Sequence, residues 1–171
     1  MANFNIDAKK DMVYDAIIIG SGISGGWAAK ELCEKGLKTL ILERGRIVEH
    51  LVDYPTMNLD PWDMELRGGL TPKEKEKHYK NIRSGWVGKD TEHFWADDAA
   101  NPYTETKPFL WLRGHQMGGK SLIWGRQTYR WSDLDFEANA KDGKGVDWPI
   151  RYKDIERWYT YVDKFAGISG E

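Results

Sequence analysis

Apolar and polar positions form a regular pattern near the start of the chain. Residues 14–20 read YDAIIIG, and three consecutive isoleucines before a glycine predict a short strand buried on both faces of a parallel sheet. Residues 23–35 carry small and apolar side chains three or four positions apart, which predicts a helix that packs closely on that sheet. The residues of this face are Gly25, Ala28, Ala29, Leu32 and Cys33.

A second apolar run follows the predicted helix. Gly36 is a natural end for the helix, and TLILE at 39–43 predicts a second buried strand. Residues 14–45 therefore read as a strand-helix-strand unit of the α/β class, with parallel strands and the usual right-handed crossover.

The middle of the chain, residues 46–110, loses this pattern. Polar and aromatic residues alternate there with frequent glycine and proline, and no second strand-helix-strand unit is predicted, so this segment reads as an excursion from the fold. Thr71, Pro72 and Glu74 predict the N-cap, first-turn proline and capping-box acid of a charged helix that runs to about Arg83. Because this helix is almost wholly polar, we expect it to lie exposed.

Helical spacing returns after residue 130. Ser132 and Asp135 predict the cap of a short helix through FEANA, and DGKG at 142–145 predicts a turn. A final amphipathic helix closed by Gly167 is predicted from apolar residues at helical spacing. These are Ile155, Trp158, Tyr159, Val162 and Phe165.

Composition narrows the classes of function. The 25 basic and 27 acidic residues give a net charge of −2 and are interspersed, so neither nucleic acid nor an anionic membrane is expected as a partner. Cys33 is the single cysteine, which excludes an internal disulfide and a metal site built on paired cysteines. Residues 1–15 lack the apolar run of a signal peptide, and no run of about 18 apolar residues occurs. We expect a cytoplasmic protein without a membrane span.

Aromatic residues are unusually abundant. The chain has nine tryptophans and eight tyrosines, most of them after residue 50. Two interpretations stay open: these rings build a ligand site, or they pack a core or a contact between subunits of an oligomer.

The loop between the first strand and the helix carries a dinucleotide-binding pattern. Gly20, Gly22 and Gly25 form G-x-G-x-x-G, and the glycines allow a tight turn, close approach of a pyrophosphate and close helix–strand packing. Glu43 follows at the end of the second strand, where its carboxylate can accept hydrogen bonds from a ribose. The predicted cofactor-binding residues of this region are Gly20, Ser21, Gly22, Ile23, Ser24, Gly25, Glu43 and Arg44.

This motif alone does not choose between NAD and FAD, and glycines that serve only a tight turn remain the alternative. The acid at position 43 argues against a 2′-phosphorylated nucleotide, whose charge it would repel. The sequence Glu43-Arg44-Gly45 resembles the ending of this unit in flavoproteins more than in dehydrogenases.

A second glycine-rich segment lies at residues 113–125, RGHQMGGKSLIWG. Gly118 and Gly119 leave backbone amides uncovered and Ser121 adds a hydroxyl, so the loop can approach a large flat ligand or be a structural turn. Together with the first unit it resembles the first signature of the glucose-methanol-choline (GMC) oxidoreductases, R-G-x-x-L-G-G-S-S-x-x-N-G. The matching residues are Arg113, Gly114, Gly118, Gly119, Ser121 and Gly125, with Met117 in place of leucine.

The match has two departures and extends downstream. Lys120 replaces a usual serine, and Trp124 stands where many members carry asparagine close to the flavin. A lysine there would stabilise negative charge on a reduced flavin or face solvent, and a tryptophan would stack near the ring or simply pack. The segment from Tyr129 onward is similar to the branch with the gluconate and fructose dehydrogenase flavoprotein subunits, related to pyranose oxidase.

The resemblance implies a function as well as a fold. It implies a partial Rossmann-like FAD-binding domain of an enzyme that oxidises CH–OH groups of sugars, polyols or sugar acids by hydride transfer to flavin. Arg113, Gly118, Gly119, Ser121, Trp124 and Gly125 would contribute to the FAD site.

The resemblance also implies that the chemistry lies outside this chain. The histidine base of the family stands on a later segment, so we assign no catalytic residue and no metal ligand, and we expect His50, His78 and His93 to be surface or loop residues. Covalent attachment of FAD through His115 is a disfavoured alternative. We expect residues 1–171 to be the N-terminal portion of an FAD-binding domain, with the flavin-contacting motif and helices at 111–171. A C-terminal half or a complementing chain would supply the rest of the enzyme, so we expect this chain to be inactive alone. The alternatives are an NAD-binding dehydrogenase domain and a non-catalytic nucleotide-binding module.

Overall fold

The computed structural model describes residues 12–170, which fall into two compact units. The first unit ends at Trp124 and the second begins at Gly125. Most of the segment on which the absence of a signal peptide was argued, residues 1–11, lies outside the described residues. Within the described part of the chain, none of the helices combines the length and the apolar character that crossing a membrane requires.

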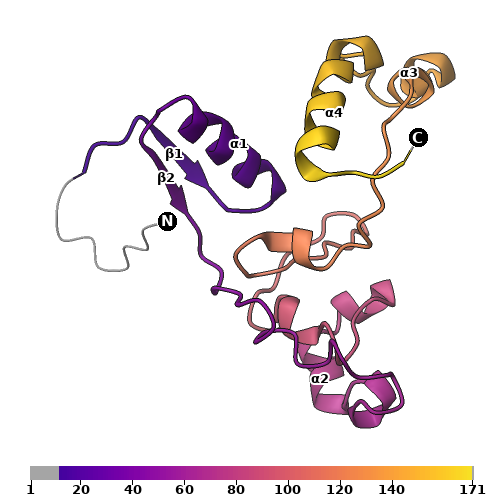
Figure 1. Cartoon of the computed structure of the whole chain (residues 1–171). Helices are drawn as coiled ribbons and strands as arrows, with labels where there is room; N and C mark the ends of the chain where they lie inside the picture. Colours follow the sequence, from indigo (N-terminus) through magenta and orange to yellow (C-terminus); the bar gives the residue numbers. More distant parts are fainter. Residues whose placement is uncertain (1–11, 171) are drawn as a thin grey trace. The chain divides into compact units, whose positions relative to one another are not determined.

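The first unit opens with the predicted strand-helix-strand unit. Strand β1 (Ala16–Ile19), helix α1 (Ile23–Glu34) and strand β2 (Thr39–Leu42) follow one another, and the two strands pair in parallel with Ala16 opposite Thr39 and Ile19 opposite Leu42. Figure 1 shows α1 lying along one side of the strand pair. The mixed α/β class, compatible with a partial Rossmann-like domain, is therefore confirmed.

The prediction that both faces of β1 are buried is wrong within the described residues. Ile18 points toward α1, but Ile17 and Ile19 are 60% and 87% exposed on the opposite face. The reason is the width of the sheet, since two strands and one helix cover only one face. For the same reason, fewer residues of α1 are buried against the sheet than predicted. Ala29 is buried, whereas Ala28 and Cys33 are exposed.

The middle segment contains the predicted capping box. The Thr71 N–H donates to the Glu74 carboxylate at 2.8 Å, the Glu74 N–H donates to the Thr71 hydroxyl at 3.3 Å, and helix α2 (Pro72–Lys77) begins there. This segment also contains short 3-10 turns at Glu65–Gly68, Asn81–Ser84 and Glu92–Phe94, and a further one follows it at Gly119–Leu122.

The prediction that this helix continues to Arg83 is wrong, although α2 itself has no buried residue, as expected. Helix α2 ends at Lys77, and both His78 and Asn81 are fully buried. The N–H groups of Lys80 and Asn81 donate to the buried Asp98 carboxylate at 3.0 and 2.8 Å, so they leave the helical hydrogen-bond pattern. A distant carboxylate thus ends the helix.

The second unit contains two helices, α3 (Asp133–Asp142) and α4 (Tyr152–Ala166). The Asp135 carboxylate accepts hydrogen bonds from the N–H and hydroxyl of Ser132, which confirms the predicted cap, and α3 is longer than FEANA. Gly143 and Gly167 end the two helices with positive φ, as expected. Trp131, Phe136 and Trp148 form an aromatic cluster with ring centroids 5.9 to 6.2 Å apart.

Candidate functional site

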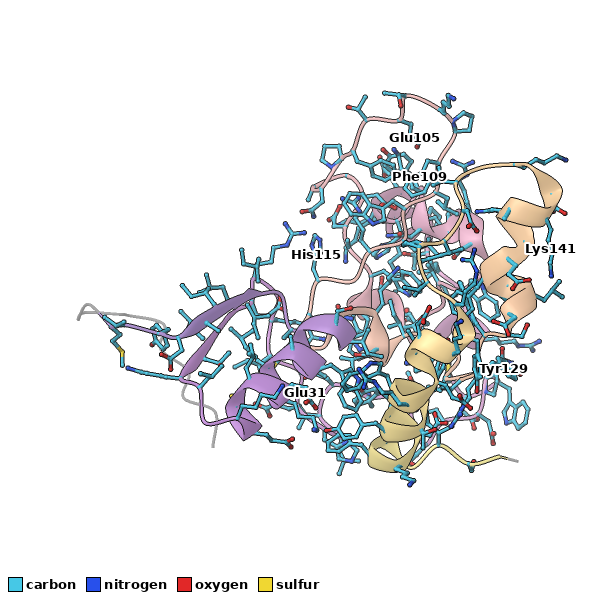
Figure 2. The ribbon with its side chains drawn as sticks, turned by 90° about the horizontal axis from the view of Figure 1, so that it is seen from above. Glu31, Glu105, Phe109, His115, Tyr129 and Lys141 are labelled. Atoms are coloured by element: carbon cyan, nitrogen blue, oxygen red, sulfur yellow. The ribbon has the colours of Figure 1, made fainter. Side chains whose placement is uncertain are left out.

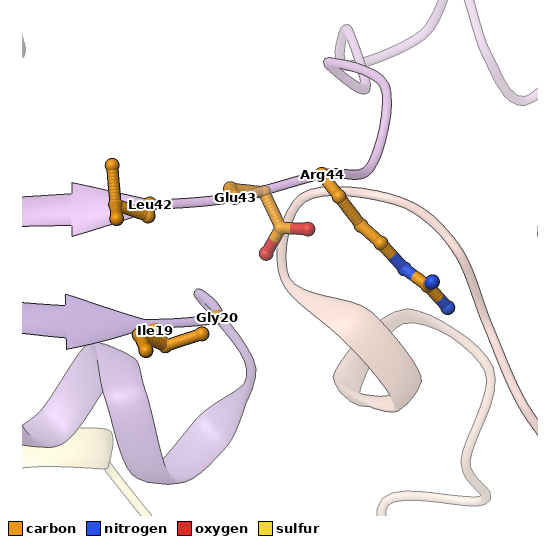
Figure 3. Close-up of a pocket in the computed structure, with 5 residues that line it drawn as sticks. All are labelled: Ile19, Gly20, Leu42, Glu43 and Arg44. Carbon is orange, nitrogen blue, oxygen red and sulfur yellow. The ribbon is translucent and has the colours of Figure 1, made fainter.

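A cavity lies at the carboxyl ends of β1 and β2. It has a volume of about 440 Å³ and is lined by Ile19, Gly20, Leu42, Glu43 and Arg44 (Figure 3). The carboxyl ends of parallel strands are where open α/β sheets bind their ligands. Gly20, Glu43 and Arg44, predicted from the sequence to bind the cofactor, therefore meet at one place.

The start of helix α1 beside the cavity offers uncapped backbone. Gly22 is the N-cap, no side chain caps the helix, and its first turn holds no acidic residue. A Cβ on Gly22 would meet no atom within 4 Å, so the space in front of this glycine is open. Free N–H groups and the positive end of the helix dipole form a favourable environment for a phosphate there.

Glu43 is held in its ionised form by backbone and hydroxyl donors. Burial disfavours the charge and raises its pKa, but hydrogen bonds from the Ser21 hydroxyl, the Ser21 N–H and the Gly45 N–H outweigh burial, so the pKa lies below its ordinary value. Ser21 donates through its N–H and its hydroxyl to Oε2 at 2.8 and 2.6 Å, and Gly45 donates to Oε1 at 2.7 Å. A carboxylate has about four acceptor positions, so Glu43 can still accept a ribose hydroxyl.

Ser21 joins the two glycine motifs. Its hydroxyl donates to Glu43 and accepts a hydrogen bond from the Gly118 N–H at 3.0 Å. Next to this bond, a Cβ on Gly119 would lie 3.4 Å from the Gly22 Cα, so the two turns are in contact. Ser21 thereby fixes the second glycine turn to the end of β2.

The second glycine turn is also attached through the backbone. A Cβ on Gly45 would lie 2.6 Å from the Gln116 backbone, and the Met117 N–H donates to the Arg46 carbonyl at 2.8 Å. Gln116 is itself buried, and its side-chain amide donates to the Gly119 carbonyl at 2.9 Å. The segment from Gly114 to Gly119 is therefore held against the residues that follow β2.

Replacing Ser21 by alanine is expected to weaken dinucleotide binding about tenfold. The variant removes one donor to Glu43 and the acceptor of the Gly118 N–H, and each lost hydrogen bond to a charged group costs about 1.5–3 kcal/mol. Titration with FAD, followed by flavin fluorescence, measures the effect. Ser169→Ala is the matched control, because Ser169 is exposed and is not among the predicted site residues. Equal affinities of the two variants would contradict the linking role of Ser21.

Other predicted site residues lie away from the cavity lining. The Arg113 guanidinium lies against Tyr103 and Trp111, 4.9 and 5.2 Å from their ring centroids, and donates to the Asn101 carbonyl at 2.6 Å and to Asp98 at 3.4 Å. In this structure Arg113 holds the excursion together.

The remaining residues of the second motif have varied surroundings. Ser121 hydrogen-bonds to the Gly118 carbonyl and braces the turn, while Lys120 is exposed and Trp124 is 43% exposed. Ile23 and Ser24 are exposed in the first turn of α1. Gly125 begins the second unit.

The histidines separate into different environments. His50 is exposed, and the His93 ring lies 2.8 Å from the Asp53 carbonyl. His78 lies in the turn after α2, as one of the two expected alternatives had it, but it is not at the surface, because it is fully buried and its ring lies 3.2 Å from the Ala96 carbonyl. His115 contacts Arg44 at the cavity, which no spacing rule could have indicated. Among residues 12–170, no cluster of three or more histidine, cysteine or acidic side chains is placed to hold a metal.

Comparison with known proteins identifies relatives along nearly the whole chain. No family model matches it. The chain is 27% identical to 6'''-hydroxyparomomycin C oxidase of Streptomyces lividus over 164 residues, 94% of this chain and 24% of that protein. It is 28% identical to the gluconate 2-dehydrogenase flavoprotein of Pantoea cypripedii, over 91% of this chain and 25% of that protein. These curated relatives are GMC oxidoreductases.

The similarity covers only part of the length of each relative. An oxygen-dependent choline dehydrogenase of Xanthomonas axonopodis pv. citri is 30% identical over 88% of this chain but only 23% of its own length. The chain thus spans about a quarter of the length of the curated relatives it matches. The resemblance found in the two glycine motifs is confirmed at the level of the family.

Proposed function

We propose that this chain binds FAD and contributes one part of a GMC-type enzyme that oxidises CH–OH groups of sugars, polyols or sugar acids. The single observation that carries the proposal is the meeting of the two glycine motifs, joined by Ser21, at the carboxyl ends of β1 and β2. The names of the relatives support the substrate class, since they include a 6'''-hydroxyparomomycin C oxidase, a gluconate 2-dehydrogenase and a fructose dehydrogenase.

The residues present fit the adenosine diphosphate part of FAD. Glu43 is ionised and keeps acceptor capacity for ribose hydroxyls, and the open space at Gly22 faces the uncapped start of α1. Ile19 and Leu42 give the cavity apolar walls. Gly20, Ser21, Gly22, Gly25, Glu43 and Arg44 would hold this part of the cofactor.

The second glycine turn is the proposed neighbour of the flavin part. Gly118 and Gly119 have positive φ values of +87° and +57°, a conformation that presents backbone without a Cβ. Ser121 and Trp124 belong to the same proposed site on the strength of the motif. When bound, the flavin would supply the hydride acceptor, while this chain would hold it and exclude water from one side. We assign no catalytic base to these residues.

The remainder of the enzyme belongs to the same proposal. A continuation of the polypeptide or a complementing chain would supply the base and the substrate pocket, and the single cysteine is in keeping with a cytoplasmic location. The proposal leaves the final electron acceptor open. An NAD-binding domain is the second candidate, because G-x-G-x-x-G with a terminal acid suits both dinucleotides.

Titration of the purified chain with FAD and with NAD tests the proposal. We expect FAD to bind at least about tenfold more tightly than NAD, because only FAD brings a flavin to the second glycine turn. Retention of absorption at about 450 nm after gel filtration would report bound flavin. FMN, which lacks adenosine, is the matched control ligand and should bind more weakly than FAD. Preference for NAD, or no affinity for any dinucleotide, would overturn the proposal.

A further inference from the structure

His115 contacts a residue that lines the cavity. Arg44 follows Glu43 at the end of β2, and its guanidinium Nη2 meets the Nε2 of His115 from the second glycine turn. Figure 2 labels the side chain of His115. An arginine side chain has donors only, so the ring nitrogen that meets it must be the unprotonated one. The contact therefore requires a neutral imidazole with its proton on Nδ1.

The surroundings of His115 favour this neutral form. Partial burial of the ring, followed by the charges of Arg44 and Arg113, lowers its pKa below the ordinary value of 6.5, while the charge of Glu43 opposes them. Glu43 and Arg44 act on the ring from the end of β2, and Arg113 acts from the same glycine-rich segment as His115. At neutral pH the ring is an acceptor, and acid converts it into a cation that repels the guanidinium.

We infer that His115 is a positioning residue that holds the Arg44 guanidinium at the cavity, where it lies against the purine of a bound adenine dinucleotide. The inference rests on the proposed function. Figure 3 shows the Arg44 side chain extending beside Glu43 at the cavity. A guanidinium is planar and weakly hydrated and stacks on aromatic faces, so it suits a purine better than a lysine would.

The composition of the cavity supports a purine rather than a phosphate as the target of Arg44. Glu43 stands next to Arg44, and its ionised carboxylate would repel a phosphate placed there. The uncapped start of α1 already offers a phosphate site at Gly22, which is not among the residues that line the cavity. Leu42 and Ile19 supply apolar surface against which a ring can lie.

The test compares FAD affinity of the full chain at about pH 8 and about pH 5 in wild type and variants. Wild type should lose about tenfold in affinity as the pH falls through the pKa of His115, which lies below its ordinary value, because protonation of the ring releases Arg44. His115→Gln, whose amide oxygen can accept from Arg44, should match wild type at the higher pH and lose the pH dependence. His115→Ala should bind FAD about tenfold more weakly than wild type does at the higher pH, and its affinity should be the same at both pH values. Arg44→Lys should bind FAD as weakly as His115→Ala. Thermal unfolding of each variant verifies the fold.

Each outcome separates the inference from the proposed function. If His115→Ala binds FAD like wild type, or if the pH dependence persists in His115→Gln, the positioning role is overturned while FAD binding stands. If Arg44→Lys binds as tightly as wild type, charge alone suffices and the purine contact is overturned. If wild type binds no FAD at the higher pH, both the proposed function and this inference fail.

Discussion

Replacing Gly25 by alanine is expected to destabilise the strand-helix-strand unit by about 3 kcal/mol or more and to abolish FAD binding. A Cβ at this position would lie 2.0 Å from the Gly20 carbonyl oxygen and 3.3 Å from the Ile18 side chain. The first contact is with backbone, which cannot rotate away, so α1 must move off β1. Overpacking of a well-packed site costs about 1–3 kcal/mol even where side chains can adjust.

Urea denaturation followed by circular dichroism measures this effect, and Gly26→Ala is the matched control. Gly26 is the next residue of α1, and a Cβ there would meet nothing within 4 Å. Alanine is a better helix former than glycine by about 1 kcal/mol, so the control should be slightly more stable than wild type. If both variants unfold at the same urea concentration, helix–strand contact at Gly25 does not limit stability.

Replacing Gly22 by aspartate is expected to abolish FAD binding while the fold persists. Gly22 has φ −63° and ψ −176°, which any residue adopts, and open space in front of it. Aspartate is a favoured N-cap and glycine is only slightly worse, so helix stability should rise by about a few tenths of a kcal/mol. The same carboxylate would stand where the phosphates bind, and repulsion of about 4 kcal/mol corresponds to a loss of at least about 100-fold in affinity.

Gly22→Asn distinguishes charge from size. Asparagine has nearly the same shape and also caps helices, but it carries no charge. We expect its FAD affinity to lie between those of wild type and Gly22→Asp, with added salt reducing only the difference due to charge. Both variants should keep the wild-type circular dichroism spectrum. Undiminished FAD binding by Gly22→Asp would place the phosphates elsewhere and make the glycine motif a structural turn.

Features that depend on neighbours in the sequence could be predicted. The capping boxes at Thr71 and Ser132 and the glycine end at Gly167 form as expected, because each involves groups within a few residues of one another. The strand-helix-strand unit and its parallel pairing also follow from local apolar spacing. Capping residues and the spacing of apolar residues were therefore enough to predict these helices and strands.

Features that depend on distant partners could not be predicted. The break after Lys77 requires Asp98, which binds the N–H groups of Lys80 and Asn81 from another part of the excursion. The exposure of Ile17 depends on how many strands and helices cover the sheet, which a single apolar run does not encode. Arg113 matches the family motif, yet its guanidinium is engaged by Tyr103 and Trp111.

By itself the sequence determined the α/β unit, the two glycine motifs and the family, because these reside in spacing and residue type along the chain. Only the tertiary structure decided that the motifs touch, through the Ser21 hydroxyl between Glu43 and Gly118 and through Gly45 against Gln116. It also brought His115 to Arg44. The physical reason is that hydrogen bonds and van der Waals contacts act over a few ångströms, whereas these partners are separated by some 70 to 100 residues of chain.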